Sequence, residues 1–222
     1  NSQGHRDLVA LAMDWRLNNN TKLEWELEQS HREQIGVNGY SLLGNQLPAT
    51  VNGRTNFSYQ TWSQPGIFDA LTGSVRLKHN LDNGWLWTTQ YGTQRLRMDD
   101  RLSFAFGCDA EGVYDRYCSN GNFDLYDYRS ENERRNQQAA SVKLKGKVAT
   151  GSVTHDLTLG LTRSQVQQRF QMQAYNYVGT GNVQGTLVNP SDPTLGDQNT
   201  NRDESSLEVS AFDAIRWNTQ WT

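Results

Sequence analysis

The sequence predicts an all-β protein, an antiparallel transmembrane β-barrel segment of about seven strands with short periplasmic turns and long extracellular loops. Three observations predict this class. Apolar and polar residues alternate along several stretches, short and long connections alternate between those stretches, and tryptophans gather beside the short connections. Only every second residue of such a strand faces lipid, so a polar average hydropathy is compatible with a membrane barrel.

The alternation is clearest near the start of the chain. Leu23, Trp25 and Leu27 take every second position within the stretch 21–29, and charged residues stand between them. A strand places all of that charge on one face, whereas a helix would scatter it. The preceding stretch alternates in the same way, and three asparagines separate the two, as in a β-hairpin. On this pattern strands are expected over 9–17, 21–29, 74–78, 85–91, 141–148, 153–161 and 207–217.

The connections between these strands alternate in length. Turns of about three residues join the members of each pair, whereas the stretches 34–68, 97–138 and 165–205 have no clear alternation and are expected as long loops. Loops above about 12–15 residues are uncommon in compact soluble domains. Outer-membrane barrels combine short periplasmic turns with long extracellular loops, so the connections favour a barrel.

The tryptophans lie close to the short turns. We expect five of them to form a girdle at one edge of the bilayer: Trp15, Trp25, Trp85, Trp87 and Trp217. Indole rings favour the headgroup boundary because their body is apolar and their N–H is polar. Trp221 is too near the end of the sequence to place, and Trp62 lies in a long loop. The alternative is a set of aromatic core residues near the hairpin ends of a soluble β-sandwich.

The polar face carries charges that complement each other. Glu24, Glu26 and Glu28 are expected to face a wet interior, as are Arg76 and Lys78 on the next strand. Exposed pairs of this kind each contribute less than about 1 kcal/mol. Three ionisable residues fall in the lipid-facing register instead: His79, His155 and Asp213. A carboxylate is costly there, and a β-bulge would turn the aspartate inward.

Composition excludes several classes of protein. The 222 residues have a formal net charge of -3, and this mild acidity argues against a nucleic-acid-binding protein. The mean hydropathy is -0.79, and no apolar run is long enough for a transmembrane helix. No nucleotide-binding, nucleophile-elbow or metal-ligand motif occurs, so we expect no catalytic residues, no metal site and no enzyme.

The two cysteines, Cys108 and Cys118, lie in one long loop. A local disulfide in an oxidising compartment is favoured over free thiols or a metal site.

The long loops are also rich in tyrosine and arginine, which suit a polar ligand with aromatic and anionic groups. The candidate ligand-binding residues are Tyr40, Trp62, Tyr126, Tyr128, Arg129, Tyr175 and Tyr177. The alternative is that loop aromatics pack on one another to order the loops.

Several local stretches resemble the TonB-dependent siderophore receptors of Gram-negative outer membranes. They read Asn-Gly-Tyr-Ser-Leu-Leu-Gly-Asn, Trp-Thr-Thr-Gln-Tyr-Gly, Tyr-Asp-Tyr-Arg-Ser-Glu-Asn-Glu-Arg and Asn-Arg-Asp-Glu, at 38–45, 87–92, 126–134 and 201–204. The resemblance implies a 22-stranded barrel plugged by an N-terminal domain. It also implies a ferric siderophore as the transported ligand, with no covalently bound cofactor, and the TonB complex and outer-membrane lipid as partners.

The sequence departs from that family by lacking a plug, a TonB box and most of the strands. Residues 1–222 are therefore expected to be an internal part of the barrel domain, unable to transport anything alone. Two other functions stay open at this point. One is a general porin-type barrel, and the other is a soluble all-β carbohydrate-active domain, whose chemistry would need two positioned carboxylates.

Overall fold

The computed structural model describes residues 4–37, 39–49, 52–57 and 59–217, and these residues form one antiparallel sheet with its loops. Apart from a short 3-10 helix, η1 (Asp109–Glu111), the regular elements within those ranges are strands. The strands are β1 (Gly4–Arg16), β2 (Thr21–Gln34), β3 (Gly66–Asn80), β4 (Leu86–Ala105), β5 (Asn122–Thr150), β6 (Val153–Arg169), β7 (Ala174–Asn182) and β8 (Arg202–Arg216). The all-β fold class is confirmed.

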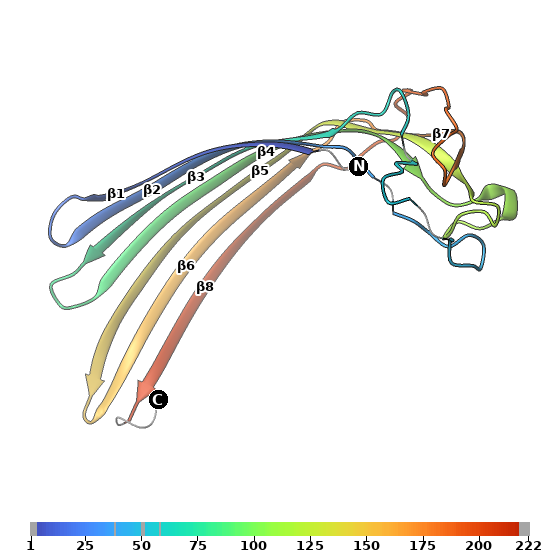
Figure 1. Cartoon of the computed structure of the whole chain (residues 1–222). Helices are drawn as coiled ribbons and strands as arrows, with labels where there is room; N and C mark the ends of the chain where they lie inside the picture. Colours follow the sequence, from blue (N-terminus) through green and yellow to red (C-terminus); the bar gives the residue numbers. More distant parts are fainter. Residues whose placement is uncertain (1–3, 38, 50–51, 58, 218–222) are drawn as a thin grey trace.

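The strands lie side by side in the order β1-β2-β3-β4-β5-β6-β8, and β7 pairs with the first part of β5. They form a curved sheet, with the short turns at one end and the long loops at the other (Figure 1). β1 and β8 each have one edge without a partner among the described residues. No α-helix within the described ranges is long and apolar enough to cross a membrane.

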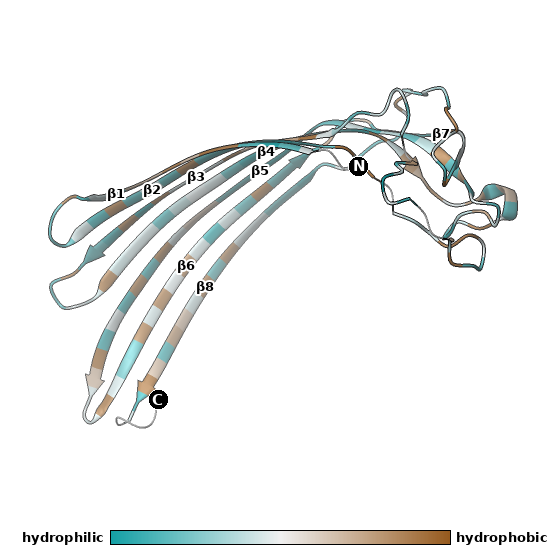
Figure 2. Cartoon of the chain, viewed as in Figure 1, coloured by the Kyte–Doolittle hydropathy of each residue, from teal (hydrophilic) through white to brown (hydrophobic). Residues whose placement is uncertain are grey.

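The sheet has one apolar face, because the ladder brings the apolar positions of neighbouring strands into register. Trp25 lies opposite Val75, and Leu161 lies opposite Val209. Bands of alternating hydropathy run along β5, β6 and β8 (Figure 2). Side chains on this face are largely exposed in the isolated chain, Val209 to 78%. We call it the outward face, since it is the one that would meet lipid, and the opposite face the inward face.

The inward face carries the complementary charges that the sequence indicates. Glu24 lies directly opposite Arg76 in the ladder. The Glu24 carboxylate accepts hydrogen bonds from Lys78 at 2.8 Å and from Arg76 at 3.2 Å, and Lys22 lies 2.9 Å away. One carboxylate therefore balances part of the charge of three cations on this face.

The ionisable residues in the outward register are paired rather than turned inward. The register between β6 and β8 is continuous around Asp213, so no β-bulge turns its side chain inward. Instead the His155 Nδ1 lies 2.7 Å from the Asp213 Oδ2 on the same face. The His79 Nδ1 lies 2.8 Å from the Thr21 hydroxyl. Each of these polar groups thus has a hydrogen-bonding partner, which lowers the cost of its place on an apolar face.

The strands continue far into the stretches expected to be loops. β4 extends to Ala105 and β5 begins at Asn122, so the stretch 97–138 is mostly strand. An eighth strand, β7, lies within the third expected loop. The third short turn is Gly151–Ser152, one residue shorter than the sequence indicates. The alternation of apolar and polar residues is weaker in the extended parts, where one face packs under loop residues and both faces carry mixed side chains.

The ends of β4 and β5 form a three-stranded sheet with β7, which projects beyond the other strands (Figure 1). We call this part the extension. One of its faces packs under loop residues and holds a small hydrophobic core: Phe57, Ala105, Tyr117, Phe123, Leu125 and Val183. The extension therefore has the buried core that the rest of the sheet lacks.

Candidate ligand-binding site

A β-bulge decides which side chains face the site. Between β4 and β5 the register shifts, so that Met98 pairs with Glu133 but Asp100 pairs with Ser130. The extra residue is on β5, where Asn132 has a positive φ of 58°, a conformation that asparagine tolerates better than most residues. A bulge of this kind reverses the alternation of one strand relative to its neighbour.

Because of the bulge, Tyr126 and Tyr128 share a face with Phe104 of β4. Phe104 lies opposite Tyr126 in the ladder. By the unbroken alternation of β4, this is the continuation of the inward face. On the other side, β7 places Tyr177 opposite Tyr126 and Tyr175 opposite Tyr128.

The five rings form what we call the tyrosine cluster: Phe104, Tyr126, Tyr128, Tyr175 and Tyr177. Tyr175 is at its centre. Its ring stacks on Tyr126 with centroids 4.6 Å apart and planes 6° from parallel. Its ring meets the Tyr128 ring edge-on, with centroids 6.3 Å apart. It meets the Phe104 ring at a tilt, with centroids 5.8 Å apart. Tyr177 is 56% exposed and Tyr175 37%, so the rings are ordered by mutual packing and still open to a ligand.

Three phenol groups of the tyrosine cluster, those of Tyr126, Tyr128 and Tyr175, stay protonated at neutral pH. Burial raises the pKa of Tyr175 to about 12, and it also raises the pKa of Tyr126 and of Tyr128. The Tyr128 hydroxyl accepts a hydrogen bond from the Gln173 side chain at 3.3 Å. The cluster therefore offers aromatic faces and neutral O–H donors rather than phenolates.

Two of the predicted residues lie outside the cluster and contact other loop residues. Tyr40 packs against Phe57 of the small hydrophobic core, with ring centroids 4.8 Å apart. Trp62 donates its indole N–H to the Asn189 carbonyl at 3.1 Å, which joins two loops. Beside it lies the buried Gln60, whose side-chain amide donates a hydrogen bond to the Leu187 carbonyl and accepts one from the Asn189 N–H. These contacts order the loops.

Arg129 lies on the opposite face of β5 from Tyr126 and Tyr128. Its guanidinium donates to both carboxylate oxygens of Asp127, at 2.9 and 3.1 Å. Asp127 is completely buried and also accepts from the Asp192 N–H. The pair anchors the 183–201 connection onto the extension. Arg116, another loop arginine, pairs with its neighbour Asp115.

A disulfide joins Cys108 and Cys118 and closes the loop beside the hydrophobic core. Glu111 lies close to both sulfur atoms. Its carboxylate accepts hydrogen bonds from the Ser119 N–H and hydroxyl, and the sulfurs are bonded to each other. The group thus has the contacts of a structural loop closure rather than those of a metal site.

The tryptophans of the expected girdle follow the outward register near the short turns. Trp15 lies opposite Leu23, and Trp87 lies opposite Leu144. The Trp85 ring occupies the space that a side chain at Gly146 would need, with a ring carbon 2.1 Å from the position that a Cβ there would take. Trp217 follows the end of β8 and is 67% exposed. Trp221 lies outside the described residues.

Phe104 is the functional candidate that sequence reasoning missed, together with Phe106. The two rings stack with their centroids 6.0 Å apart, and the Phe104 ring also contacts that of Tyr175. Both lie in the stretch expected as a loop. The alternation of Leu102, Phe104 and Phe106 was the available signal for a strand with an aromatic face.

Comparison with family models and with curated proteins finds no match. Solved structures do match over nearly the whole chain. The ferripyoverdine receptor of the Pseudomonas aeruginosa outer membrane matches with a TM-score of 0.74 at 16% identity, covering 99% of this chain and 29% of the receptor. The ferric-catecholate import receptor Fiu of E. coli K12 matches with a TM-score of 0.74 at 12% identity, covering 98% and 32%.

BauA, the ferric preacinetobactin receptor of Acinetobacter baumannii, matches with a TM-score of 0.71 at 14% identity, covering 96% of this chain and 31% of that protein. The predicted resemblance is therefore confirmed at the level of fold. The chain has the fold of part of a TonB-dependent receptor barrel and spans about a third or less of each of these receptors. These structural neighbours are transport receptors, not enzymes.

Proposed function

We propose that residues 1–222 are an internal segment of the barrel domain of an outer-membrane receptor that takes up a ferric siderophore. In this proposal the plug and the remaining strands are supplied by parts of the protein outside these residues, and the TonB complex drives uptake through them. The observation that supports this proposal most strongly is the tyrosine cluster, which continues the inward face of a receptor-like sheet at its loop end.

The geometry of the cluster favours recognition of an intact chelate. Stacked rings such as Tyr126 and Tyr175 bind flat aromatic or conjugated groups, and their hydroxyls donate hydrogen bonds to chelate oxygens. Because the pKa of Tyr175 is raised to about 12, its phenol does not compete for iron as a phenolate near pH 7. The role is therefore binding and transport, not catalysis.

Substitutions in the complete receptor test this proposal. We expect Tyr175→Ala to weaken ferric-siderophore binding roughly ten- to a hundredfold, as for aromatic hot spots. Tyr175→Phe keeps the ring stacking, so we expect it to lose less binding affinity than Tyr175→Ala. Tyr59→Ala is the matched control, because Tyr59 is 60% exposed and lies outside the cluster.

The measurement is a titration of the purified receptor with ferric catecholate, hydroxamate and carboxylate siderophores, read by quenching of intrinsic fluorescence. Equal affinity of Tyr175→Ala and Tyr59→Ala for every chelate would remove the cluster from the site. A tyrosinate-to-iron absorption band on binding would contradict the neutral phenols. Passive, unselective passage of small solutes without chelate binding would favour the porin alternative.

A further inference from the structure

Carboxylates border the tyrosine cluster at both of its ends. At one end the half-buried Asp100 of β4 lies opposite Ser130 of β5, and the alternation of β4 places it on the inward face. The buried Glu133 accepts a hydrogen bond from the Ser130 hydroxyl. The Gln173 side-chain amide donates to Ser130 at 2.7 Å and to the Tyr128 hydroxyl at 3.3 Å. Glu133 is thus linked to the tyrosine cluster through two hydrogen-bonded side chains.

A second pair of carboxylates lies at the other end of the cluster. Asp124 precedes Tyr126 by two residues on β5, so it shares the face of that ring, and it is buried. Its carboxylate accepts a hydrogen bond from the Asp109 N–H at 2.7 Å. The Asp109 carboxylate accepts one from the Tyr114 hydroxyl at 3.0 Å. We call the two sets the acidic pairs: Asp100 with Glu133, and Asp109 with Asp124.

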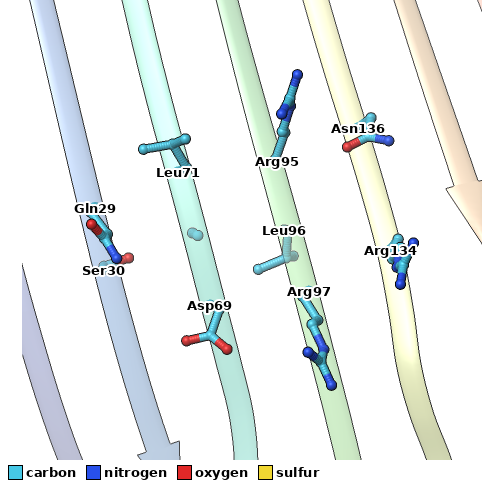
Figure 3. Close-up of a pocket in the computed structure, with 10 residues that line it drawn as sticks. Gln29, Ser30, Asp69, Leu71, Arg95, Leu96, Arg97, Arg134 and Asn136 are labelled. Atoms are coloured by element: carbon cyan, nitrogen blue, oxygen red, sulfur yellow. The ribbon is translucent and has the colours of Figure 1, made fainter.

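Several arginines near the loop end of the sheet lie on the opposite face. Figure 3 shows three of them on β4 and β5, in the outward register: Arg95, Arg97 and Arg134. In the extension, Arg101 and Arg129 lie opposite each other in the ladder, also on the face away from the tyrosine rings. Both form ion pairs with carboxylates of β5, Glu131 and Asp127 respectively. These arginines therefore do not neutralise the acidic pairs.

On the inward face the acidic pairs have little positive charge beside them. The Arg135 Nη2 lies 3.9 Å from the Glu133 Oε2, a single long contact. Asp100 has neither a hydrogen bond nor an ion pair with the residues that the structure describes. Burial raises the pKa of Asp100, and the nearby Glu133 and Asp99 raise it further, as for a carboxylate that lacks a positive partner. The acidic pairs thus keep an excess of negative charge among the described residues.

The tyrosine rings between the acidic pairs attract the same kind of group. The face of an aromatic ring carries negative partial charge, and rings gathered around one point bind ammonium groups. The rings of Tyr175 and Tyr177 are 37% and 56% exposed, so their faces are open to a ligand. A carboxylate beside such a group adds a charge-assisted hydrogen bond. Ring faces and carboxylates therefore favour a cation, and they disfavour an anion.

We propose that the tyrosine cluster and the acidic pairs bind an ammonium group of the ligand, so that the ferric chelate taken up is a positively charged one. This inference rests on the proposed function and names the class of chelate. The bound ammonium group offsets the repulsion between carboxylates that otherwise lie together without a positive partner. An anionic chelate is repelled by the same carboxylates, so charge contributes to specificity.

Two matched pairs of probes test the proposal on the complete receptor in octyl glucoside, a detergent without an ammonium group. Ferrioxamine B is a ferric trihydroxamate with a free ammonium end, and its N-acetyl form has the same iron centre without that charge. Choline and 3,3-dimethyl-1-butanol have the same shape with and without a charge. We expect the charged member of each pair to bind about tenfold more tightly. Fluorescence quenching reports the chelates, and saturation-transfer NMR reports the small probes.

The variant is Asp100→Asn/Glu133→Gln, which keeps the shape of both side chains and removes two charges. It should reduce the preference for the charged probes to about twofold, by the loss of charge-assisted contacts. The matched control, Asp115→Asn/Asp203→Asn, removes the same charge from two exposed carboxylates outside the cluster and should keep the preference. A heat-dependent gel shift of the barrel shows that both variants fold. Asp100→Asn alone serves where the double variant does not fold.

The outcomes separate this inference from the proposed function. Equal binding of choline and its neutral analogue, no binding of either, or equal losses in both double variants would overturn the ammonium site. Chelate binding without any preference for the ammonium form would do the same and leave the proposed function standing. If choline binding depended on the acidic pairs while no ferric chelate bound, the ammonium site would stand and the proposed function would fail.

Discussion

Along most of the sheet the apolar side chains point outward, whereas the extension formed by β4, β5 and β7 buries its own. Every buried apolar residue within the described ranges belongs to the extension or its loops, among them Phe57, Phe123 and Leu125. In the sheet, Leu207 and Val209 are 68% and 78% exposed. The apolar face of the sheet is therefore left uncovered by the described residues, while the extension is ordered by packing and by a disulfide. Stability in the two regions should respond to different changes.

The largest expected effect is in the core of the extension. Phe123 is completely buried. Its ring centroid lies 4.8 Å from that of Tyr117 and 5.6 Å from that of Phe57. We expect Phe123→Ala to destabilise the extension by about 3–5 kcal/mol, because it leaves a cavity among aromatic rings. Limited proteolysis of the loops should accelerate, while the heat-dependent gel shift of the barrel stays unchanged.

Tyr59→Ala serves as the control for that experiment, since this exposed ring contributes to neither region. If Phe123→Ala unfolded the barrel and the extension together, the two regions would be one cooperative unit and the comparison would fail.

A smaller effect is expected from the disulfide. Cys108→Ser/Cys118→Ser opens a loop whose ends are 10 residues apart in the sequence. We expect the loss of this cross-link to destabilise the folded loop by about 2–3 kcal/mol, because the unfolded chain gains entropy. Hydrogen exchange should rise in the 106–121 loop and leave β1–β3 unaffected. The same result should follow from reduction of the parent protein. Unchanged exchange in the loop would mean that packing alone orders it.

The smallest effect is expected on the outward face of the sheet. His155→Leu leaves Asp213 without its partner at 2.7 Å, and a lone carboxylate facing lipid costs about 1–2 kcal/mol. Unfolding by urea in phospholipid vesicles should show this loss. The double variant His155→Leu/Asp213→Leu should recover most of it, because no polar group is then left unpaired. Additive losses in the double variant would contradict a direct pair.

Much of the sheet could be predicted from the sequence because a sheet with one apolar and one polar face leaves a simple pattern. The alternation of Leu23, Trp25 and Leu27 identifies a strand and its outward face without any neighbour. The two cysteines lie close enough in the chain to suggest their bond. The tyrosines at 126, 128, 175 and 177 stand out as candidates by composition alone. Which of them meet could not be predicted, since nothing local records the pairing of β7 with β5.

The sequence by itself determined the all-β class, the short turns and the apolar face of the sheet, since each depends on neighbouring residues and on a period of two. The tertiary structure alone decided the rest. The bulge at Asn132 aims Tyr126 and Tyr128 at Tyr175, and the ladder brings His155 beside Asp213. It also aligns Arg97, Arg134 and Arg169. These arrangements depend on strand register, which long-range hydrogen bonding sets and a single chain segment does not record.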